Sequence, residues 1–139
     1  MKSHKDLLEV NQSFYDAFES LDVESMGEVW AQSGDDVCIH PGWEILTGWK
    51  DVRASWQTIF ANTAFMRVDV TDVAVTQWEK TARITCVENL FTVIDGQTIH
   101  SRVACTNLFI YTDNGWRLSS HHGSAMASQP IDIPQTDIN

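Results

Sequence analysis

The second half of the sequence constrains the fold most, because four extended stretches follow one another there with short turns between them. These stretches are rich in Val, Ile, Thr and aromatic residues, which favour strands. Two of the turns contain Asp95-Gly96 and Asn114-Gly115, dipeptides typical of tight hairpins. We therefore expect a long antiparallel meander with strands at residues 65–78, 80–94, 98–111 and 116–123.

The first half of the chain predicts helices. Between residues 5 and 21, apolar side chains recur every three or four positions, the spacing of one helix face: Leu7, Val10, Phe14, Phe18 and Leu21. Asp22 can cap a second helix, because its carboxylate can accept from exposed N–H groups of the first turn. A third helix is expected after Thr47-Gly48, where Val52, Trp56, Ile59 and Phe60 fall at helical spacing.

Between the helices lies the stretch CIHPGWEILTGW, in which a short strand at residues 37–40 ends at Pro41-Gly42. Helices followed by strands, without βαβ alternation, indicate an α+β architecture. We expect a single domain at residues 1–125. The remaining residues, 126–139, hold two prolines and little periodicity, and they are expected to form a flexible tail.

Composition excludes several classes of function. Nine Lys and Arg against nineteen Asp and Glu give a net charge of −10, which disfavours nucleic acids and anionic membranes as partners. There is no signal-like segment and no apolar run of membrane-spanning length, so a cytoplasmic protein is expected. The three cysteines are far apart in sequence and are expected to be buried free thiols.

The order of elements and three motifs, SLDVESMGEVW, DDVCIHPG and GWRLSSHHGS, resemble the nuclear transport factor 2-like superfamily over roughly residues 5–125. Within it, the sequence is most similar to SnoaL-like and ketosteroid isomerase-like proteins. The closing strands also resemble the association domain of calcium/calmodulin-dependent protein kinase II. The resemblance implies a cystatin-like α+β cone, in which three N-terminal helices pack on a strongly curved, mostly antiparallel sheet around an internal pocket. It also implies a homodimer formed through the outer face of the sheet.

The resemblance places His40 at the position of the acid/base residue of the family's enzymes. Ketosteroid isomerases have an aspartate before proline at this position, and their oxyanion-hole tyrosine corresponds to Phe14, with Tyr15 one residue away. Phenylalanine cannot donate a hydrogen bond, so true steroid isomerisation is rejected. From its chemistry alone, His40 is either a general base tuned by partial desolvation beside Trp43 or a strand-end histidine bonded to a carbonyl group.

Glu88 is expected to share one strand face with Ile84, Cys86 and Leu90, where an ionised carboxylate needs a partner. We interpret it as a second catalytic residue in the pocket. The alternatives are an ion pair with Arg102, or an outward Glu88 with Asn89 facing inward.

The other expected ligand-binding residues are Tyr15, Trp43, Trp56, Asn107 and His122. Asn107 shares a face with Cys105 and Phe109, and parity with Trp116 and Leu118 selects His122 over His121 as the inward histidine. Trp43 and Trp56 are expected either to line the pocket or to fill it. No motif has a diagnostic metal-ligand spacing or cofactor fingerprint, so neither a metal nor a cofactor is expected.

Two functions remain open from the sequence. The first is a cofactor-independent isomerase, cyclase or dehydratase acting on a small apolar, carbonyl-bearing molecule. The second is a non-catalytic module that binds a ligand or assembles with its own copies. A shared scaffold does not choose between them, because one fold hosts many functions.

Overall fold

A computed structural model describes residues 4–127 of the chain. Three helices come first, α1 (His4–Ser20), α2 (Val23–Val29) and α3 (Trp49–Ala61), with two short strands, β1 (Val37–Ile39) and β2 (Leu46–Thr47), between the last two. Four long strands follow: β3 (Met66–Trp78), β4 (Thr81–Ile94), β5 (Gln97–Thr112) and β6 (Gly115–Ala125). Helices followed by strands confirm the expected α+β class.

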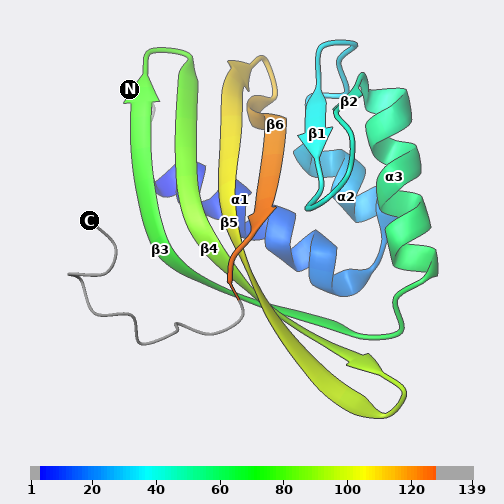
Figure 1. The fold of residues 1–139 in the computed structure, drawn as a ribbon. Coiled ribbons are helices and arrows are strands. Elements are labelled where there is room, and N and C mark those ends of the chain that lie inside the picture. Colours follow the sequence, from blue (N-terminus) through cyan, green and yellow to red (C-terminus); the bar gives the residue numbers. More distant parts are fainter. Residues whose placement is uncertain (1–3, 128–139) are drawn as a thin grey trace.

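The six strands form one sheet in the order β2-β1-β6-β5-β4-β3 (Figure 1). The pair β1 and β6 is parallel, and every other neighbouring pair is antiparallel. The parallel pair brings the strand before His40 next to the end of the meander, with Ile39 opposite His122. Residues far apart in sequence therefore meet at this point of the sheet.

The hairpin between β4 and β5 extends well beyond the rest of the sheet (Figure 1). Its turn residues Asp95 and Gly96 both have positive φ, at 52° and 79°. A two-residue turn with two positive φ angles fits the twist of antiparallel strands, and glycine adopts this conformation without strain. The hairpin expected from the Asp-Gly dipeptide is confirmed.

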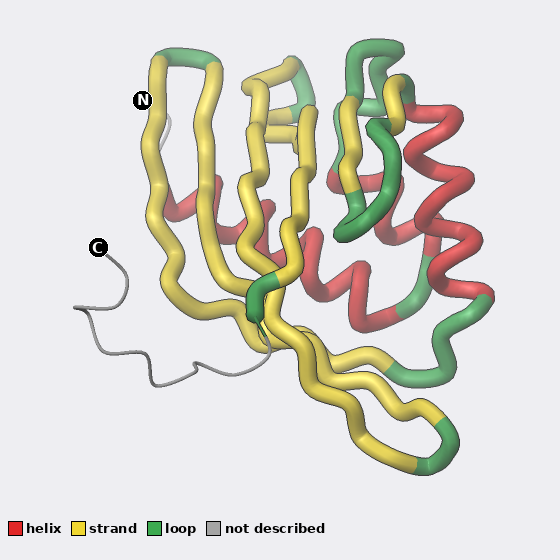
Figure 2. The backbone as a smooth tube through the Cα atoms, viewed as in Figure 1, coloured by secondary structure: helices red, strands yellow, loops and turns green. Residues whose placement is uncertain are grey.

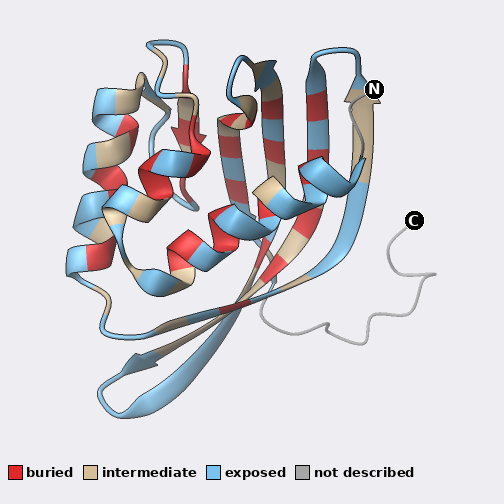
Figure 3. Ribbon diagram, turned by 180° about the vertical axis from the view of Figure 1, so that it is seen from behind, coloured by how far each residue is buried: buried red, intermediate tan, exposed pale blue. Residues whose placement is uncertain are grey.

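The helices lie on one face of the curved sheet, and α1 crosses the inner side of the long strands (Figure 3). On β4 and β5, buried and more exposed residues alternate along the strand, as expected for a sheet with one covered face. The hydrophobic core fills the space between helices and sheet, and its largest fully buried side chains include Trp30, Trp56, Tyr15, Phe14 and Phe109.

The strand β6 contains an irregularity that changes which side its residues face. Leu108 on β5 pairs with Ser120, whereas the next residue, Phe109, pairs with Leu118, so Ser119 is an extra residue on β6. Such a β-bulge reverses the inward and outward alternation beyond it. Residues 121 and 123 face inward as a result, rather than residues 122 and 124.

Between β1 and β2 the chain makes a loop around Pro41 and Gly42 (Figure 2). Gly42 has φ of 82°, and the N–H of Trp43 donates to the carbonyl oxygen of His40 at 2.9 Å. The bend expected from Pro-Gly is therefore formed directly after His40.

The expected flexible tail, residues 126–139, lies outside the described residues except for Met126 and Ala127. The N–H of Met126 donates to the carbonyl oxygen of Arg102 at 2.9 Å, which continues the pairing between β5 and β6. Among residues 4–127, no helix has both the length and the hydropathy needed to cross a membrane.

Candidate functional site

Glu88 lies in the middle of β4 and faces the interior, where it is 2% exposed. The hydroxyl of Tyr15, on α1, donates to Glu88 Oε2 at 2.7 Å. Arg102 lies opposite Asn89 rather than Glu88 in the β4–β5 ladder, so the register does not give the ion pair that the sequence left open. Burial raises the pKa of Glu88 to about 7, an effect that the hydrogen bond from Tyr15 opposes.

Asn107, on β5, connects the helix to the sheet through its amide group. Its Nδ2 donates to Asn11 Oδ1 at 2.9 Å and to the Tyr15 hydroxyl at 3.2 Å. Its Oδ1 lies 2.7 Å from His121 Nδ1 and accepts from the thiol of Cys105 at 3.3 Å. Each of these groups is buried, so the amide satisfies polar atoms that would otherwise destabilise the core.

The inward histidine of β6 is His121 and not His122, so the expectation for His122 was wrong. His121 is 2% exposed, whereas His122 is exposed on the outer face. The cause is the bulge at Ser119, because parity counted from Trp116 and Leu118 holds only for an unbroken strand. His122 instead lines a hollow of about 410 Å³ on the outer face, together with Asp72, Thr85, Val87, Ala104, Thr106 and Ser124.

His40 follows β1 and is buried, at 4% exposed, rather than placed at an open mouth. Its Nε2 lies 2.8 Å from the hydroxyl of Ser55, on α3, and that hydroxyl donates to the carbonyl oxygen of Val52 at 2.6 Å. Because a serine hydroxyl has a single proton, His40 Nε2 must donate to Ser55, which leaves Nδ1 unprotonated. Burial lowers the pKa of His40 to about 4, so the ring is neutral at pH 7.

The two tryptophans beside His40 have different environments. Trp56 is 1% exposed and packs edge-on against the His40 ring at 4.7 Å between centroids, whereas Trp43 is 43% exposed and contacts the same ring at 4.8 Å. The indole N–H of Trp56 has no acceptor among the described residues. Trp56 therefore carries an unused buried donor, and Trp43 covers His40 from the solvent side.

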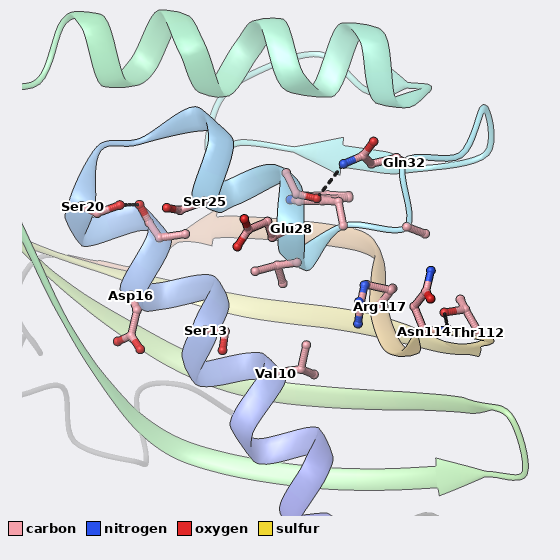
Figure 4. Close-up of a pocket in the computed structure, with 15 residues that line it drawn as sticks. Val10, Ser13, Asp16, Ser20, Ser25, Glu28, Gln32, Thr112, Asn114 and Arg117 are labelled. Carbon is pink, nitrogen blue, oxygen red and sulfur yellow. Dashed lines mark hydrogen bonds between the residues drawn. The ribbon is translucent and has the colours of Figure 1, made fainter.

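The concave interior is occupied by side chains. Trp56 contacts Phe14, Phe18, Phe60 and His121 as well as His40. A larger hollow of about 1000 Å³ lies elsewhere, between α1, α2 and the β5–β6 turn, with side chains of Ser13, Asp16, Glu28 and Arg117 around it (Figure 4). Neither this hollow nor the outer-face hollow is lined by His40, Trp56 or Glu88.

Three interior residues have side chains that bind metals in other proteins. Glu88, Cys105 and His121 each offer one ligand atom, and these atoms lie within 4.8 Å of one another. Hydrogen bonds within the protein already engage all three residues. A hydrogen bond with Cys86 and burial both raise the pKa of the Cys105 thiol far above its usual range, which opposes the thiolate that a metal requires. The expected absence of a metal stays a prediction.

The structure brings together Tyr15, Trp56, Glu88, Asn107 and His40, all expected from the sequence, and adds Asn11, Ser55, Cys105 and His121. A sequence signal existed for Asn11, which lies four residues after Leu7 and four before Tyr15 on the apolar face of α1. Ser55 likewise lies three residues after Val52 on the apolar face of α3, but this spacing gives no sign of its contact with His40. His121 was missed because a bulge is not visible in the residue pattern.

Comparison with protein families finds a match to the SnoaL-like domain over residues 7–128. Among solved structures, a candidate dehydratase of the NTF2-like family from Streptomyces avermitilis is 33% identical, with a TM-score of 0.82 over 88% of this chain and 95% of that one. A candidate calcium/calmodulin-dependent protein kinase type II association domain from Thiobacillus denitrificans is 29% identical, with a TM-score of 0.77 over 85% and 93% of the two chains.

More distant matches extend this likeness. An NTF2-like protein with a cystatin-like fold from Novosphingobium aromaticivorans is 18% identical, with a TM-score of 0.74 over 91% of this chain and 84% of that one, and confirms the cystatin-like fold. The F-box protein SKIP8 of Arabidopsis thaliana is 25% identical over 120 residues, which are 86% of this chain. The chain spans about half (49%) of the length of that curated relative.

Proposed function

The chain belongs to the SnoaL-like domain family. We propose that the side chains packed in its concave interior move apart to admit a small apolar, carbonyl-bearing molecule, and that the interior performs cofactor-independent isomerase- or lyase-type chemistry. The observation that carries this proposal is the carboxyl group of Glu88, buried in the interior and held by the hydroxyl of Tyr15 at 2.7 Å. Among residues 4–127 no Lys or Arg pairs with Glu88. A buried carboxyl in that position is costly, and such groups concentrate at functional sites.

Glu88 and His40 are the proton-carrying groups in this proposal. General acid–base catalysis is most effective when the pKa of the group lies near the working pH. Burial gives Glu88 a pKa of about 7 and His40 a pKa of about 4, so Glu88 is the better match at neutral pH. His40, neutral and with Nδ1 unprotonated, is the acceptor that can orient a substrate donor or take up a proton in a coupled step.

The surrounding residues supply binding. The unused N–H of Trp56 is a buried donor that a ligand carbonyl oxygen would satisfy. Asn107 and Tyr15 hold Glu88 in place, and Trp43 closes the interior on its exposed side. The relative from Streptomyces avermitilis, a candidate dehydratase, supports lyase chemistry by likeness alone.

The test begins with a thermal-shift screen of apolar ketones, aldehydes and esters, followed by turnover assays of the compounds that bind. We expect Glu88→Gln to lower the rate of the chemical step by roughly 100-fold or more and His40→Gln to lower it less, while both keep most of the affinity. The outward variant His122→Gln is the matched control and should keep the wild-type rate. A compound that is turned over at an unchanged rate by Glu88→Gln would show that this assignment is wrong.

A second proposal is supported by the outer face of the sheet. Leu108 lies opposite Arg83, on the other side of the strand from Asn107, and is 36% exposed. Trp78, on the same face, is 51% exposed. Exposed apolar groups on a sheet face favour a covering subunit, and the Thiobacillus denitrificans relative is a candidate association domain. We expect a homodimer through this face.

Light scattering at micromolar concentration tests the dimer. The wild-type protein should have twice the chain mass, and Leu108→Glu should give a monomer with unchanged circular dichroism. A monomeric wild-type protein would rule out this proposal while leaving the proposal for the interior intact.

A further inference from the structure

Glu88 and His121 face each other across the interior without a hydrogen bond. The distance between Glu88 Oε2 and His121 Nε2 is 3.9 Å, and each residue is 2% exposed. A separation of 3.9 Å is too long for a hydrogen bond, yet it is too short to hold a water molecule between the two buried side chains. The chemical relation of the pair therefore depends on which of the two atoms carries a proton.

The hydrogen bonds of Asn107 decide the state of His121. The amide nitrogen of Asn107 is used by Asn11 and Tyr15, so its oxygen is the atom 2.7 Å from His121 Nδ1. A carbonyl oxygen only accepts, which requires a proton on Nδ1. Burial, together with His40 and His122, lowers the pKa of His121 to about 3, so the ring is neutral and Nε2 presents a lone pair to Glu88.

This arrangement penalises an ionised Glu88. A carboxylate would place negative charge against the lone pair of His121 Nε2, whereas a carboxylic acid can direct its O–H at that lone pair. Closing the 3.9 Å gap by about 1 Å would bring the two atoms to the usual O–H···N distance. The neutral acid and the neutral imidazole are thus complementary.

We propose that the Glu88 carboxyl group carries a proton directed at the lone pair of His121 Nε2, and that Asn107 maintains this state by fixing the tautomer of His121. The inference rests on the proposed function, in which Glu88 releases this proton and later recovers it. His121 stays neutral throughout and acts as a positioning residue that keeps Glu88 in its acid form.

The other titratable groups around the pair are Tyr15 on α1, Cys38 on β1, Cys86 on β4 and Cys105 on β5, with His40 and His122 near His121. Burial is the main cause that raises the pKa values of Tyr15 and Cys38. The pKa of Cys105 is raised chiefly by its hydrogen bond with Cys86. All three groups therefore stay neutral near pH 7. The same hydrogen bond lowers the pKa of Cys86. A titration of Glu88 therefore needs a variant of Cys86 as a control.

Nuclear magnetic resonance of the ligand-free protein tests the pair without a substrate. With 15N-labelled histidine, His121 should have a protonated Nδ1 and an unprotonated Nε2 from pH 5 to pH 8. With 13C-labelled glutamate, Glu88 should titrate near pH 7. In Asn107→Leu, His121 is free to move its proton to Nε2 and donate it to the carboxylate, so the midpoint of Glu88 should fall by about one pH unit or more.

The controls are His122→Asn, a substitution of the neighbouring outward histidine, and Cys86→Ser, which should both leave the Glu88 midpoint in place. A wild-type His121 that is protonated on Nε2, or that is charged at pH 6, would overturn the proposal. So would an Asn107→Leu protein whose His121 tautomer reverses while Glu88 titrates as before. If Asn107→Leu fails to fold, the 15N spectrum of the wild-type protein still shows which nitrogen of His121 carries the proton, and so tests the proposal. Failure of the turnover assays would leave these measurements unaffected.

Discussion

Two neighbouring residues of β6 show how differently the two faces of the sheet are built. His121 is enclosed by Phe14, Trp56 and Asn107 and lies 3.9 Å from Glu88, whereas His122 is exposed beside Thr106. The inner face combines aromatic packing with a connected set of buried polar groups, whereas the polar side chains of the outer face make local contacts between neighbouring strands. A connected polar network is costly to bury unless each member is satisfied, so it marks the inner face as the specialised one.

The two tryptophans that contact His40 give the largest expected contrast. Trp56→Ala should lower the free energy of unfolding by about 3–5 kcal/mol, because it removes a fully buried indole and leaves a cavity. Trp43→Ala should cost less than about 1 kcal/mol, since much of its ring is exposed. Urea denaturation of the two variants measures both values. Equal losses would mean that the two rings do not differ in packing as described.

The two histidines of β6 provide the next comparison. His121→Ala should cost about 2–4 kcal/mol, because it leaves the Asn107 Oδ1 atom short of a donor and opens space beside Phe14. His122→Ala should change stability by no more than about 0.5 kcal/mol. Thermal and urea unfolding of the two variants show which substitution costs more stability. A larger loss for His122→Ala would place the bulge at a different residue.

A smaller contrast concerns two glycines. A Cβ atom at Gly123, which faces inward, would lie 2.9 Å from Val103 Cγ1 and 3.3 Å from Pro41, whereas at Gly34 it would meet nothing within 4 Å. Gly123→Ala should therefore lower stability by about 1–3 kcal/mol through overpacking. Gly34→Ala should be neutral or slightly stabilising. If both variants unfold at the wild-type midpoint, the close approach of β6 to Pro41 is not maintained in solution.

Much of the architecture could be predicted because each element carries a local signal. Asp22 accepts from the N–H of Glu24 at 3.2 Å as an N-cap, and the order of β3 to β6 follows from tight turns such as Asp95-Gly96. Glu88 faces inward as its alternation with Ile84 and Cys86 indicated. These features depend on residues close together in sequence, so a pattern is enough to find them.

The remaining parts of the site depend on contacts between distant segments. Ser55 meets His40 only because α3 packs against β1, and Asn11 meets Asn107 across 96 positions of sequence. The bulge at Ser119 is set by pairing between β5 and β6, and it overrides the strict alternation from which His122 was selected. Residue periodicity describes one element at a time, so it could not reveal these relations.

The carboxyl group on the inner face is protonated more readily in the folded protein than in the unfolded chain. Burial raises the pKa of Glu88 from the ordinary value of 4.5 to about 7. The folded state therefore binds this proton more tightly. Its contribution to stability is fully present below about pH 4.5 and is lost as the pH rises through about 7. His40 and His121, whose pKa values burial lowers, act in the opposite direction, so a comparison with a variant is needed.

The most direct measurement is the free energy of unfolding of the wild-type protein and of Glu88→Gln, determined by urea denaturation from pH 4.5 to pH 8. Glutamine keeps an acceptor for Tyr15 but does not titrate, and the two histidines contribute equally to both proteins. We expect the wild-type value minus the Glu88→Gln value to fall by roughly 3 kcal/mol between pH 4.5 and pH 8, with most of the fall below pH 7. A difference that is flat, or that rises with pH, would contradict it.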